Sequence, residues 1–443
     1  MRRKLKYAAA AAAGVLLLLW LFCLPRDLFE GTTYSTVVTD RNGALLGARV
    51  ADDGQWRFPP CDTFPEKFVK ALVEFEDRTF FDHCGVSPRA LVRAAIQNIR
   101  NGRIVSGGST LTMQVIRLSR QKPRTLWQKL VETCMATRLE LRCSKEEILR
   151  LYAAHAPFGG NVVGIDAARW RYLGSDRTEL SWAEAATLAV LQNAPSSIHL
   201  ARNRDQLQAK RNRLLARLHA KGEIDEEDYA LALEEPLIGE PYPMPQYAPH
   251  LVEWYDRKAH GQRTVTHIDR NLQHRMEEVL VRWNRELRQK GIRDLAAIIV
   301  EVESGEPAAY CGNSDLSFDR DGKWVDIARS PRSSGSILKP LLYAAALEQG
   351  TILPNSLLPD VPMDFGGFAP KNFDGTYAGA IEADQALALS LNIPNVYLLK
   401  EYGILRFVET LRQAGLKTLS RPADEYGLSL ILGGAEVTLV DIA

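Results

Sequence analysis

The hydrophobic pattern begins with a long apolar run behind a basic start. Four of the first six residues are arginine or lysine, and residues 7–24 contain no charged side chain. As a helix this run would be roughly 27 Å long, close to the thickness of a bilayer's hydrocarbon core. The pattern predicts a cytoplasmic tail over 1–6, a transmembrane anchor over 7–24, and a chain that lies outside the cytoplasm after Pro25.

Two other interpretations of this run require residues that it lacks. A cleaved signal peptide needs small residues before its cleavage site, whereas Phe22, Cys23 and Leu24 end the run. Lipid attachment at Cys23 needs a small preceding residue in place of Phe22. An uncleaved anchor therefore fits best.

After the anchor the pattern predicts a mainly α-helical domain over 35–240. Residues 36–46 have the pattern of a strand, a turn and a second strand. From about Phe64 the apolar positions recur at helical spacing, and no strand is predicted before residue 240. Ser144 and Glu147 form the sequence signature of a capping box, and residues 181–192 predict a buried helix rich in alanine and leucine.

A cluster of prolines marks the next boundary. Four prolines lie between residues 241 and 249, so we predict an extended linker over 241–270. Beyond it, residues 296–310 have the pattern of a β-hairpin, which is typical of an α/β or α+β domain. This second domain is predicted over 271–443.

Composition narrows the possible functions. A formal net charge of +1 argues against a nucleic-acid-binding protein that relies on a broad basic surface. The six cysteines include no CxxC pair, which argues against a metal site built from them. Cys61, Cys84, Cys134 and Cys143 lie in one region and could pair outside the cytoplasm, or could be small buried residues.

The first candidate site combines a carboxylate with a helix start. Glu76 lies near the predicted end of a helix with an apolar face, a setting that suits general acid–base chemistry. Gly108 leaves room for a ligand, and Ser109 or Thr110 can cap a helix that begins at Leu111. Free N–H groups at such a start would suit a pyrophosphate.

Lys129 and Glu132 add a second charged pair. A spacing of three places both on one helical face. They form either an exposed salt bridge or a cation for a leaving phosphate with a second carboxylate beside it.

Four motifs in order carry a family resemblance. They are Glu76-Asp77-x-x-Phe80-x-x-His83-x-Gly85, Gly107-Gly108-Ser109-Thr110-x-Thr112-x-Gln114, Lys129-x-x-Glu132, and Ser144-Lys145-x-x-Ile148-Leu149-x-x-Tyr152. In this order they resemble the peptidoglycan glycosyltransferase motifs of class A penicillin-binding proteins. Residues 112–114 and 156–160 resemble the 1C subtype in particular.

The resemblance implies a lysozyme-like fold that polymerises lipid II and releases undecaprenyl pyrophosphate. Glu76 would be the general base, and Glu132 a second catalytic carboxylate. The implied substrate-binding residues are Asp77, Phe80, His83, Gly108, Ser109, Thr110, Thr112, Gln114, Lys129 and Lys145. No cofactor is implied with certainty, although Mg²⁺ or Mn²⁺ could assist the leaving group, and moenomycin is an expected inhibitor.

Three positions depart from the family pattern. Ala154 stands where the family usually has asparagine, Gln128 replaces an arginine, and Met113 stands where many relatives carry glutamine. These departures bear on the level of activity more than on the fold.

A second motif set resembles a different enzyme domain. Ser336-x-x-Lys339 is followed by Ser390-x-Asn392, as in penicillin-binding transpeptidase domains of the serine β-lactamase-like α/β fold. The resemblance implies that Ser336 is the acyl nucleophile and Lys339 its base, that Ser390 and Asn392 assist, and that penicillin acylates the serine. The family's Lys-[Ser/Thr]-Gly motif is missing, so we expect this domain to be incomplete and its transpeptidase activity impaired.

The expected protein is a single-pass inner-membrane enzyme with its C-terminal part in the periplasm. Its expected partners are lipid II, the nascent glycan chain, the membrane and other cell-wall synthesis proteins, with no nucleic acid. Two alternatives stay open: a lysozyme-like glycan hydrolase, which would also use a glutamate, and a non-catalytic scaffold of a cell-wall complex.

Overall fold

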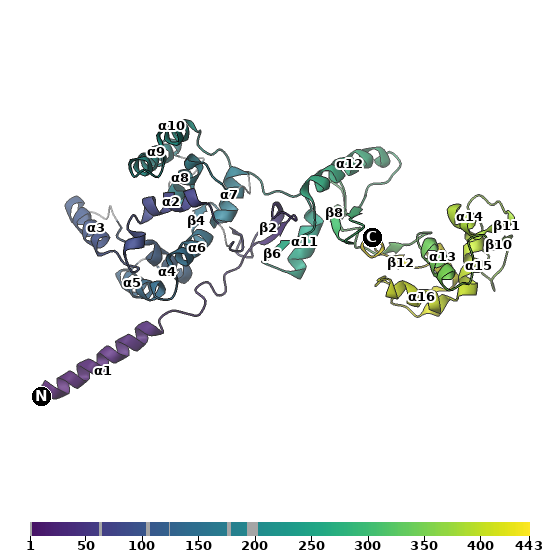
Figure 1. Ribbon diagram of the computed structural model, residues 1–443, viewed down its shortest axis with the longest axis horizontal. Coiled ribbons are helices and arrows are strands. Elements are labelled where there is room, and N and C mark those ends of the chain that lie inside the picture. Colours follow the sequence, from purple (N-terminus) through teal and green to yellow (C-terminus); the bar gives the residue numbers. More distant parts are fainter. Residues whose placement is uncertain (1, 62–63, 103–106, 124, 175–178, 193–202) are drawn as a thin grey trace. The chain divides into compact units, whose positions relative to one another are not determined.

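The computed structural model describes residues 2–61, 64–102, 107–123, 125–174, 179–192 and 203–443 (Figure 1). The chain divides into two compact units, Met1–Thr266 and His267–Ala443. We call them unit 1 and unit 2 and describe each by itself.

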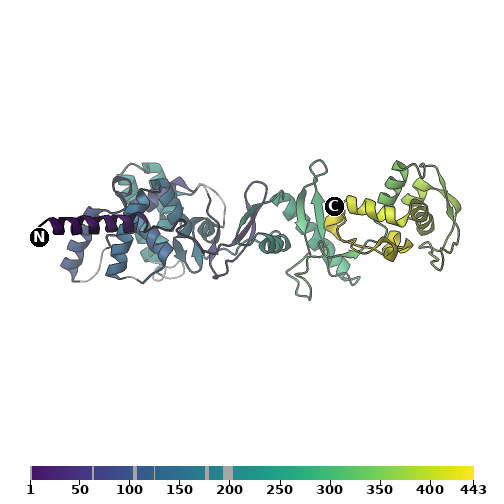
Figure 2. The ribbon, with the colours of Figure 1, turned by 90° about the horizontal axis from the view of Figure 1, so that it is seen from below.

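Unit 1 is mainly helical in both ribbon views (Figures 1 and 2). Its helices are α1 (Arg2–Leu21), α2 (Glu66–Glu76), α3 (Pro88–Asn101), α4 (Leu111–Arg120), α5 (Leu126–Glu140), α6 (Lys145–His155), α7 (Ile165–Leu173), α8 (Trp182–Leu191), α9 (Arg204–Ala220), α10 (Glu226–Glu234) and α11 (Pro249–Lys258), with the 3₁₀ turn η1 (Phe80–Asp82). Its strands are β1 (Thr36–Thr39), β2 (Leu45–Arg49), β3 (Trp56–Arg57), β4 (Pro157–Gly159), β5 (Val162–Val163) and β6 (Arg263–Val265).

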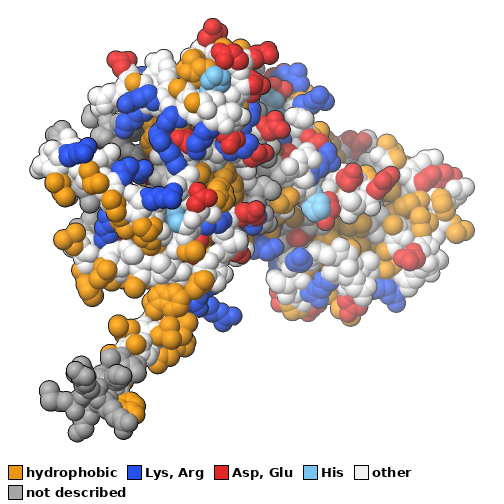
Figure 3. Space-filling model, turned by 60° about the vertical axis from the view of Figure 1, so that its left-hand side comes forward, with side chains coloured by type: hydrophobic (Ala, Val, Ile, Leu, Met, Phe, Trp, Pro, Cys, Tyr) orange, Lys and Arg blue, Asp and Glu red, His pale blue; other side chains and the backbone are white. Residues whose placement is uncertain are grey.

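Helix α1 covers most of the predicted anchor over 7–24. It begins at Arg2 and ends at Leu21, and its side chains from Val15 to Leu19 are exposed (Figure 3). Within the described part of the chain, no helix is both long enough and apolar enough to cross a membrane.

The predicted strand–turn–strand over 36–46 is confirmed. Strands β1 and β2 pair antiparallel, with Thr36 opposite Arg49, and β6 pairs parallel to β1 on its other edge. Helix α11 and β6 lie within 241–270, the region predicted as a linker, and both belong to unit 1.

The prediction of no strand between about Phe64 and residue 240 was wrong at β4 and β5. Strands β3, β5 and β4 form a small sheet in that order. Each has only two or three residues, too few for an alternating pattern to show in the sequence.

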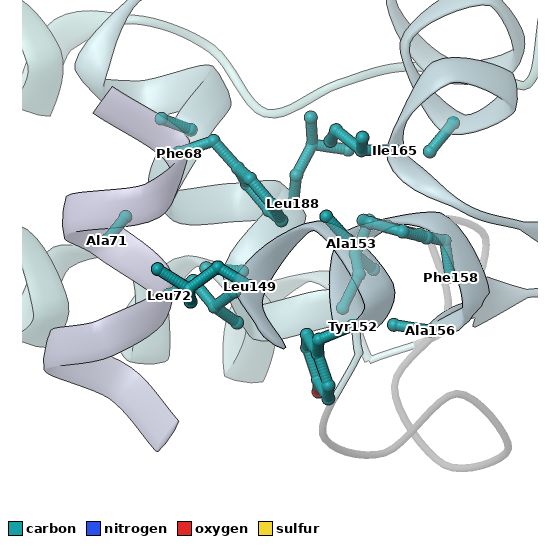
Figure 4. Packing of buried hydrophobic residues seen from close by; sticks show 14 of the residues in the cluster. Phe68, Ala71, Leu72, Leu149, Tyr152, Ala153, Ala156, Phe158, Ile165 and Leu188 are labelled. Atoms are coloured by element: carbon teal, nitrogen blue, oxygen red, sulfur yellow. The ribbon is translucent and has the colours of Figure 1, made fainter. Parts of the chain in front are cut away.

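The core of unit 1 forms around α8, the predicted buried helix. All ten of its residues except Glu184 are buried. Figure 4 shows Phe68 and Leu72 of α2 and Leu149 of α6 in the same apolar cluster as Leu188. The capping box of Ser144 and Glu147 at the start of α6 is also confirmed, so the helices that carry the candidate residues are fixed by burial and by caps.

Gly85 packs against the backbone of α5 and is expected to tolerate no side chain. A Cβ atom there would lie 2.6 Å from the carbonyl oxygen of Ala136, and its φ of +85° is unfavourable for other residues. Gly102 has φ +62° but open space around its Cβ position. We expect Gly85→Ala to lower the free energy of unfolding by about 3 kcal/mol or more, and Gly102→Ala by about 1 kcal/mol. Urea unfolding of both variants measures the difference, and equal losses would contradict the steric account.

Unit 2 contains two apolar clusters. Its helices are α12 (Arg270–Arg288), α13 (Lys339–Glu348), α14 (Ala383–Ala388), α15 (Asn392–Tyr402), α16 (Ile404–Gln413), α17 (Ala423–Tyr426) and α18 (Leu439–Ile442), with the 3₁₀ helix η2 (Leu428–Leu432). Its strands are β7 (Ala297–Val300), β8 (Pro307–Cys311), β9 (Arg332–Ser333), β10 (Leu357–Asp360), β11 (Gly379–Glu382) and β12 (Glu436–Val437). The predicted hairpin is confirmed, since β7 and β8 pair antiparallel and Met276 of α12 packs on them. A larger cluster joins α13, α15 and α16.

The cysteines do not pair in this structure. All six are free, and Cys311 is the buried one. Of the four cysteines for which the sequence left disulfides or burial open, Cys61 and Cys143 are half-buried and Cys84 and Cys134 are exposed, so burial does not explain them.

Candidate active site

Glu76 lies at the last position of α2 and contacts α4. The amide nitrogen Nε2 of Gln114 donates a hydrogen bond of 2.8 Å to Oε2 of Glu76. The hydroxyl of Tyr152, on α6, donates to Oε1 of the same glutamine at 3.4 Å. Three helices therefore bring a carboxylate, an amide and a phenol into one row of hydrogen bonds.

The start of α4 is capped from two sides. The Thr110 hydroxyl accepts from the N–H of Met113 at 3.2 Å and donates to the carbonyl of Gly85 at 2.6 Å. The Asp77 carboxylate accepts from the N–H of Leu111 at 3.1 Å and bonds His83 Nε2 at 3.0 Å. Two N–H groups that we expected to be free for phosphate are thus already occupied by protein oxygens.

Arg117 is a site residue that the sequence motifs did not include. Its guanidinium bonds both carboxylate oxygens of Glu132 at 3.0–3.3 Å and the Ser109 hydroxyl at 3.0 Å. Glu132 is only 7% exposed. Arg117 follows Gln114 by three residues and therefore shares its helical face. This spacing is the feature of the sequence from which Arg117 could have been predicted as a site residue.

Lys129 does not pair with Glu132, the partner that its spacing of three suggested. Glu132 pairs with Arg117 across α4 and α5, and within the described residues the Lys129 ammonium group has no ion-pair partner. A half-buried cation is therefore left available one turn before Glu132.

Four of the predicted substrate-binding residues form a second network. Lys145 donates to Glu140 at 2.8 Å and to the His83 carbonyl at 2.7 Å, and it lies 4.3 Å from the centre of the Phe80 ring. Thr112 donates to Glu140 at 2.5 Å. Because Thr112 and Phe80 are fully buried, they support the site from behind in this structure.

The electrostatics place Tyr152 between a carboxylate and a cation. Burial raises the pKa of Tyr152 well above its ordinary value, Glu76 raises it further, and Arg117 acts in the opposite direction. Glu76 and Arg117 therefore share one electrostatic neighbourhood.

The donor set does not fit a divalent cation held by the protein alone. Both oxygens of Glu132 are bonded by Arg117, and Oε2 of Glu76 is bonded by Gln114. Across the described ranges, no group of three or more His, Cys, Asp or Glu side chains converges as a metal site would.

The second candidate site lies in unit 2, around Lys339. Its ammonium group donates to the Ser390 carbonyl at 2.7 Å, to the Ser390 hydroxyl at 3.2 Å and to Oδ1 of Asn392 at 2.9 Å. Burial lowers the pKa of Lys339 to about 8. Ser336 precedes α13 in a turn, and its side chain is exposed. The structure thus brings Lys339, Ser390 and Asn392 together and leaves the Ser336 hydroxyl outside their hydrogen bonds.

The lowered pKa of Lys339 predicts a pH dependence of stability. The unfolded chain keeps the ordinary pKa of 10.5 and binds more protons than the folded chain above about pH 8. Stability should therefore rise as the pH increases from about 8 toward 10.5, by an order of 2 kcal/mol for this group. Urea unfolding of unit 2 between about pH 7.5 and pH 10 measures it, with Lys339→Met as the control that should lose this rise. An equal slope in both proteins would contradict the assignment.

Comparisons with known proteins match both units. Residues 43–219 match the transglycosylase family and residues 295–429 the penicillin-binding protein transpeptidase domain. The chain is 41% identical to penicillin-binding protein 1C of Escherichia coli strain K12, over 92% of this chain and 53% of that protein. The chain belongs to the class A penicillin-binding proteins.

Two further known proteins are similar to this chain. Penicillin-binding protein 1B of Vibrio cholerae is 31% identical over 90% of this chain and 54% of its own length. A solved structure of penicillin-binding protein 1A from Haemophilus influenzae covers 93% of this chain and 67% of its own chain at 19% identity and a TM-score of 0.41. The chain thus spans about half the length of the curated relatives named here.

Membership in the class A penicillin-binding proteins confirms the family resemblance. The fold class is confirmed in its coarser form, a transglycosylase domain followed by a transpeptidase domain. The family carries out peptidoglycan synthesis by glycosyl transfer and transpeptidation, and its members are cell-envelope proteins.

Proposed function

We propose that unit 1 polymerises lipid II into glycan strands, with Glu76 as the general base. The observation that carries the proposal is the meeting of Glu76 with Gln114 of α4 at 2.8 Å, one helical turn from the Arg117–Glu132 pair. A proton acceptor and a phosphate-binding cation lie on adjoining helices. The family of transglycosylases matched over 43–219 supports the same reaction.

The proposed step moves one proton and exchanges one bond. The 4-hydroxyl oxygen of the acceptor sugar attacks the anomeric carbon of the growing chain, while Glu76 takes the hydroxyl proton. The bond from that carbon to the pyrophosphate oxygen breaks, and the configuration inverts. Because the negative charge develops on the leaving pyrophosphate, cations belong beside it, and Arg117 and Lys129 are the side chains we assign to it.

Lipid II turnover by the purified full chain tests the proposal against the hydrolase alternative. We expect polymerised glycan, and we expect moenomycin to block its formation. Cleavage of preformed glycan without polymer would favour a hydrolase. A chain that forms no polymer, but whose Glu76→Gln variant complements a deletion strain as well as the parent, would favour a scaffold. Cell fractionation tests the proposed location at the periplasmic face of the inner membrane.

We assign Ser336 of unit 2 as the acyl nucleophile of a transpeptidase site with impaired activity. The supporting observation is that the Lys339 amine bonds Ser390 and Asn392, while the Ser336 hydroxyl is exposed and bonds neither. A neutral lysine must reach the serine proton for acylation to be fast.

Labelling with a fluorescent penicillin tests this assignment. We expect the full chain to show no stable label, or a label at least about tenfold slower than that of a relative that carries the Lys-[Ser/Thr]-Gly motif. Ser336→Ala provides the background. Rapid labelling of the parent chain that is lost in Ser336→Ala would contradict the impaired activity but would support Ser336 as the nucleophile.

A further inference from the structure

Tyr152 is a buried tyrosine with a polar end directed to the candidate site. It is 3% exposed and belongs to the same apolar cluster as Leu72 and Leu149. Its hydroxyl points away from these apolar side chains (Figure 4). There it donates to Oε1 of Gln114 at 3.4 Å, and Nε2 of that glutamine donates to Glu76 at 2.8 Å.

The hydrogen bonds of Gln114 with Glu76 and with Tyr152 require the same orientation of its amide. A glutamine side chain has a donor end and an acceptor end, and an ionised carboxylate can only accept. Glu76 therefore requires the nitrogen, which leaves the oxygen on the side of Tyr152, where a hydroxyl donates to it. In the reversed orientation, the amide oxygen would face the carboxylate oxygen, and neither atom could donate.

Tyr152 is suited to act as a permanent donor. Burial and the nearby Glu76 carboxylate raise the pKa of its phenol well above the ordinary value. The hydroxyl therefore stays protonated at neutral pH. Its donation to Gln114 does not switch off during the reaction.

We propose that Tyr152 is a positioning residue of glycosyl transfer, which fixes the Gln114 amide so that its nitrogen faces Glu76 and holds that carboxylate in one rotamer. The role rests on the proposed function of unit 1. Tyr152 touches neither substrate nor the reacting atoms in this role, because it acts through Gln114.

A double-mutant cycle on the full chain tests the proposal. Lipid II polymerisation is measured for the parent chain, Tyr152→Phe, Gln114→Leu and the double variant, each as a pH profile with kcat and KM separated. Tyr172→Phe is the matched control, because Tyr172 is also buried in unit 1 and its hydroxyl donates to the Phe158 and Gly159 carbonyls. Thermal unfolding of every variant reports its folding.

The expected result is a fall in kcat of about fivefold to tenfold for Tyr152→Phe with KM nearly unchanged. The acid limb of its pH profile should move to higher pH, because the ionised Glu76 loses a fixed donor. The double variant should be no slower than Gln114→Leu alone, and Tyr172→Phe should keep the parent profile. The proposal would be overturned if the fall in kcat of the double variant equalled the product of the two single falls. It would also be overturned if the pH profile of Tyr152→Phe equalled that of Tyr172→Phe. A parent chain that forms no polymer would overturn the proposed function itself.

Discussion

Glu76→Gln is expected to lower kcat for lipid II polymerisation by about a thousandfold, with KM changed little. The substitution keeps the shape of the side chain and its contact with Gln114, but it removes the group that accepts the proton. Binding of the substrate uses other side chains, so the loss should appear in kcat. Initial rates of polymer formation at saturating lipid II measure it.

Glu74→Gln is the matched control for this prediction. Glu74 lies on the same helix, but its carboxylate is 3% exposed and pairs with Arg78 and Lys221 rather than with α4. Its neutralisation should lower the free energy of unfolding by about 2 kcal/mol and leave kcat within about twofold of the parent. Equal losses of kcat in both variants would mean that charge on α2, and not the base at its end, controls the rate.

Arg117→Gln is expected to lower kcat by about a hundredfold, because it removes the cation beside the leaving pyrophosphate. It should also cost about 2 kcal/mol of stability, since Glu132 is left buried without its partner. Polymerisation rates and urea unfolding measure the two effects separately.

The double variant Arg117→Gln with Glu132→Gln separates the two roles of Arg117. Replacing both charges by amides should restore most of the lost stability, because no unpaired charge stays buried. The rate should stay low, since the phosphate still lacks its cation. Recovery of the parental rate in this variant would show that Arg117 serves only to hold Glu132.

The sequence predicted those contacts that depend on one helix or on one turn. Glu76 at the end of α2, the Thr110 cap and the capping box of Ser144 all follow from local rules of residue type and spacing, and all three are present. Such features are visible in the sequence because both partners lie within a few residues.

Contacts between helices were harder to predict. The i to i+3 spacing predicted a pair between Lys129 and Glu132. In the structure α4 packs on α5, and Glu132 pairs instead with Arg117, which lies fifteen residues earlier in the sequence. No single-helix rule describes that crossing. The same limit applies to Tyr152, whose partner Gln114 lies on another helix.

The prolines in 241–270 predicted an extended linker, but one of them begins a helix. Pro249 is the first residue of α11, a position that proline favours because its missing N–H would be unbonded there. In the sequence this proline could not be told from those of an extended linker. The pairing of β6 with β1, which lies more than two hundred residues earlier in the chain, left no local signal.

The stoichiometry of the reaction tests the central claim most directly. Lipid II is given to the full chain, and the undecaprenyl pyrophosphate released is counted against the disaccharide units joined. The account predicts one pyrophosphate for each unit added, and neither product from Glu76→Gln. Joined or cleaved glycan without matching pyrophosphate, or an unchanged yield from Glu76→Gln, would contradict it.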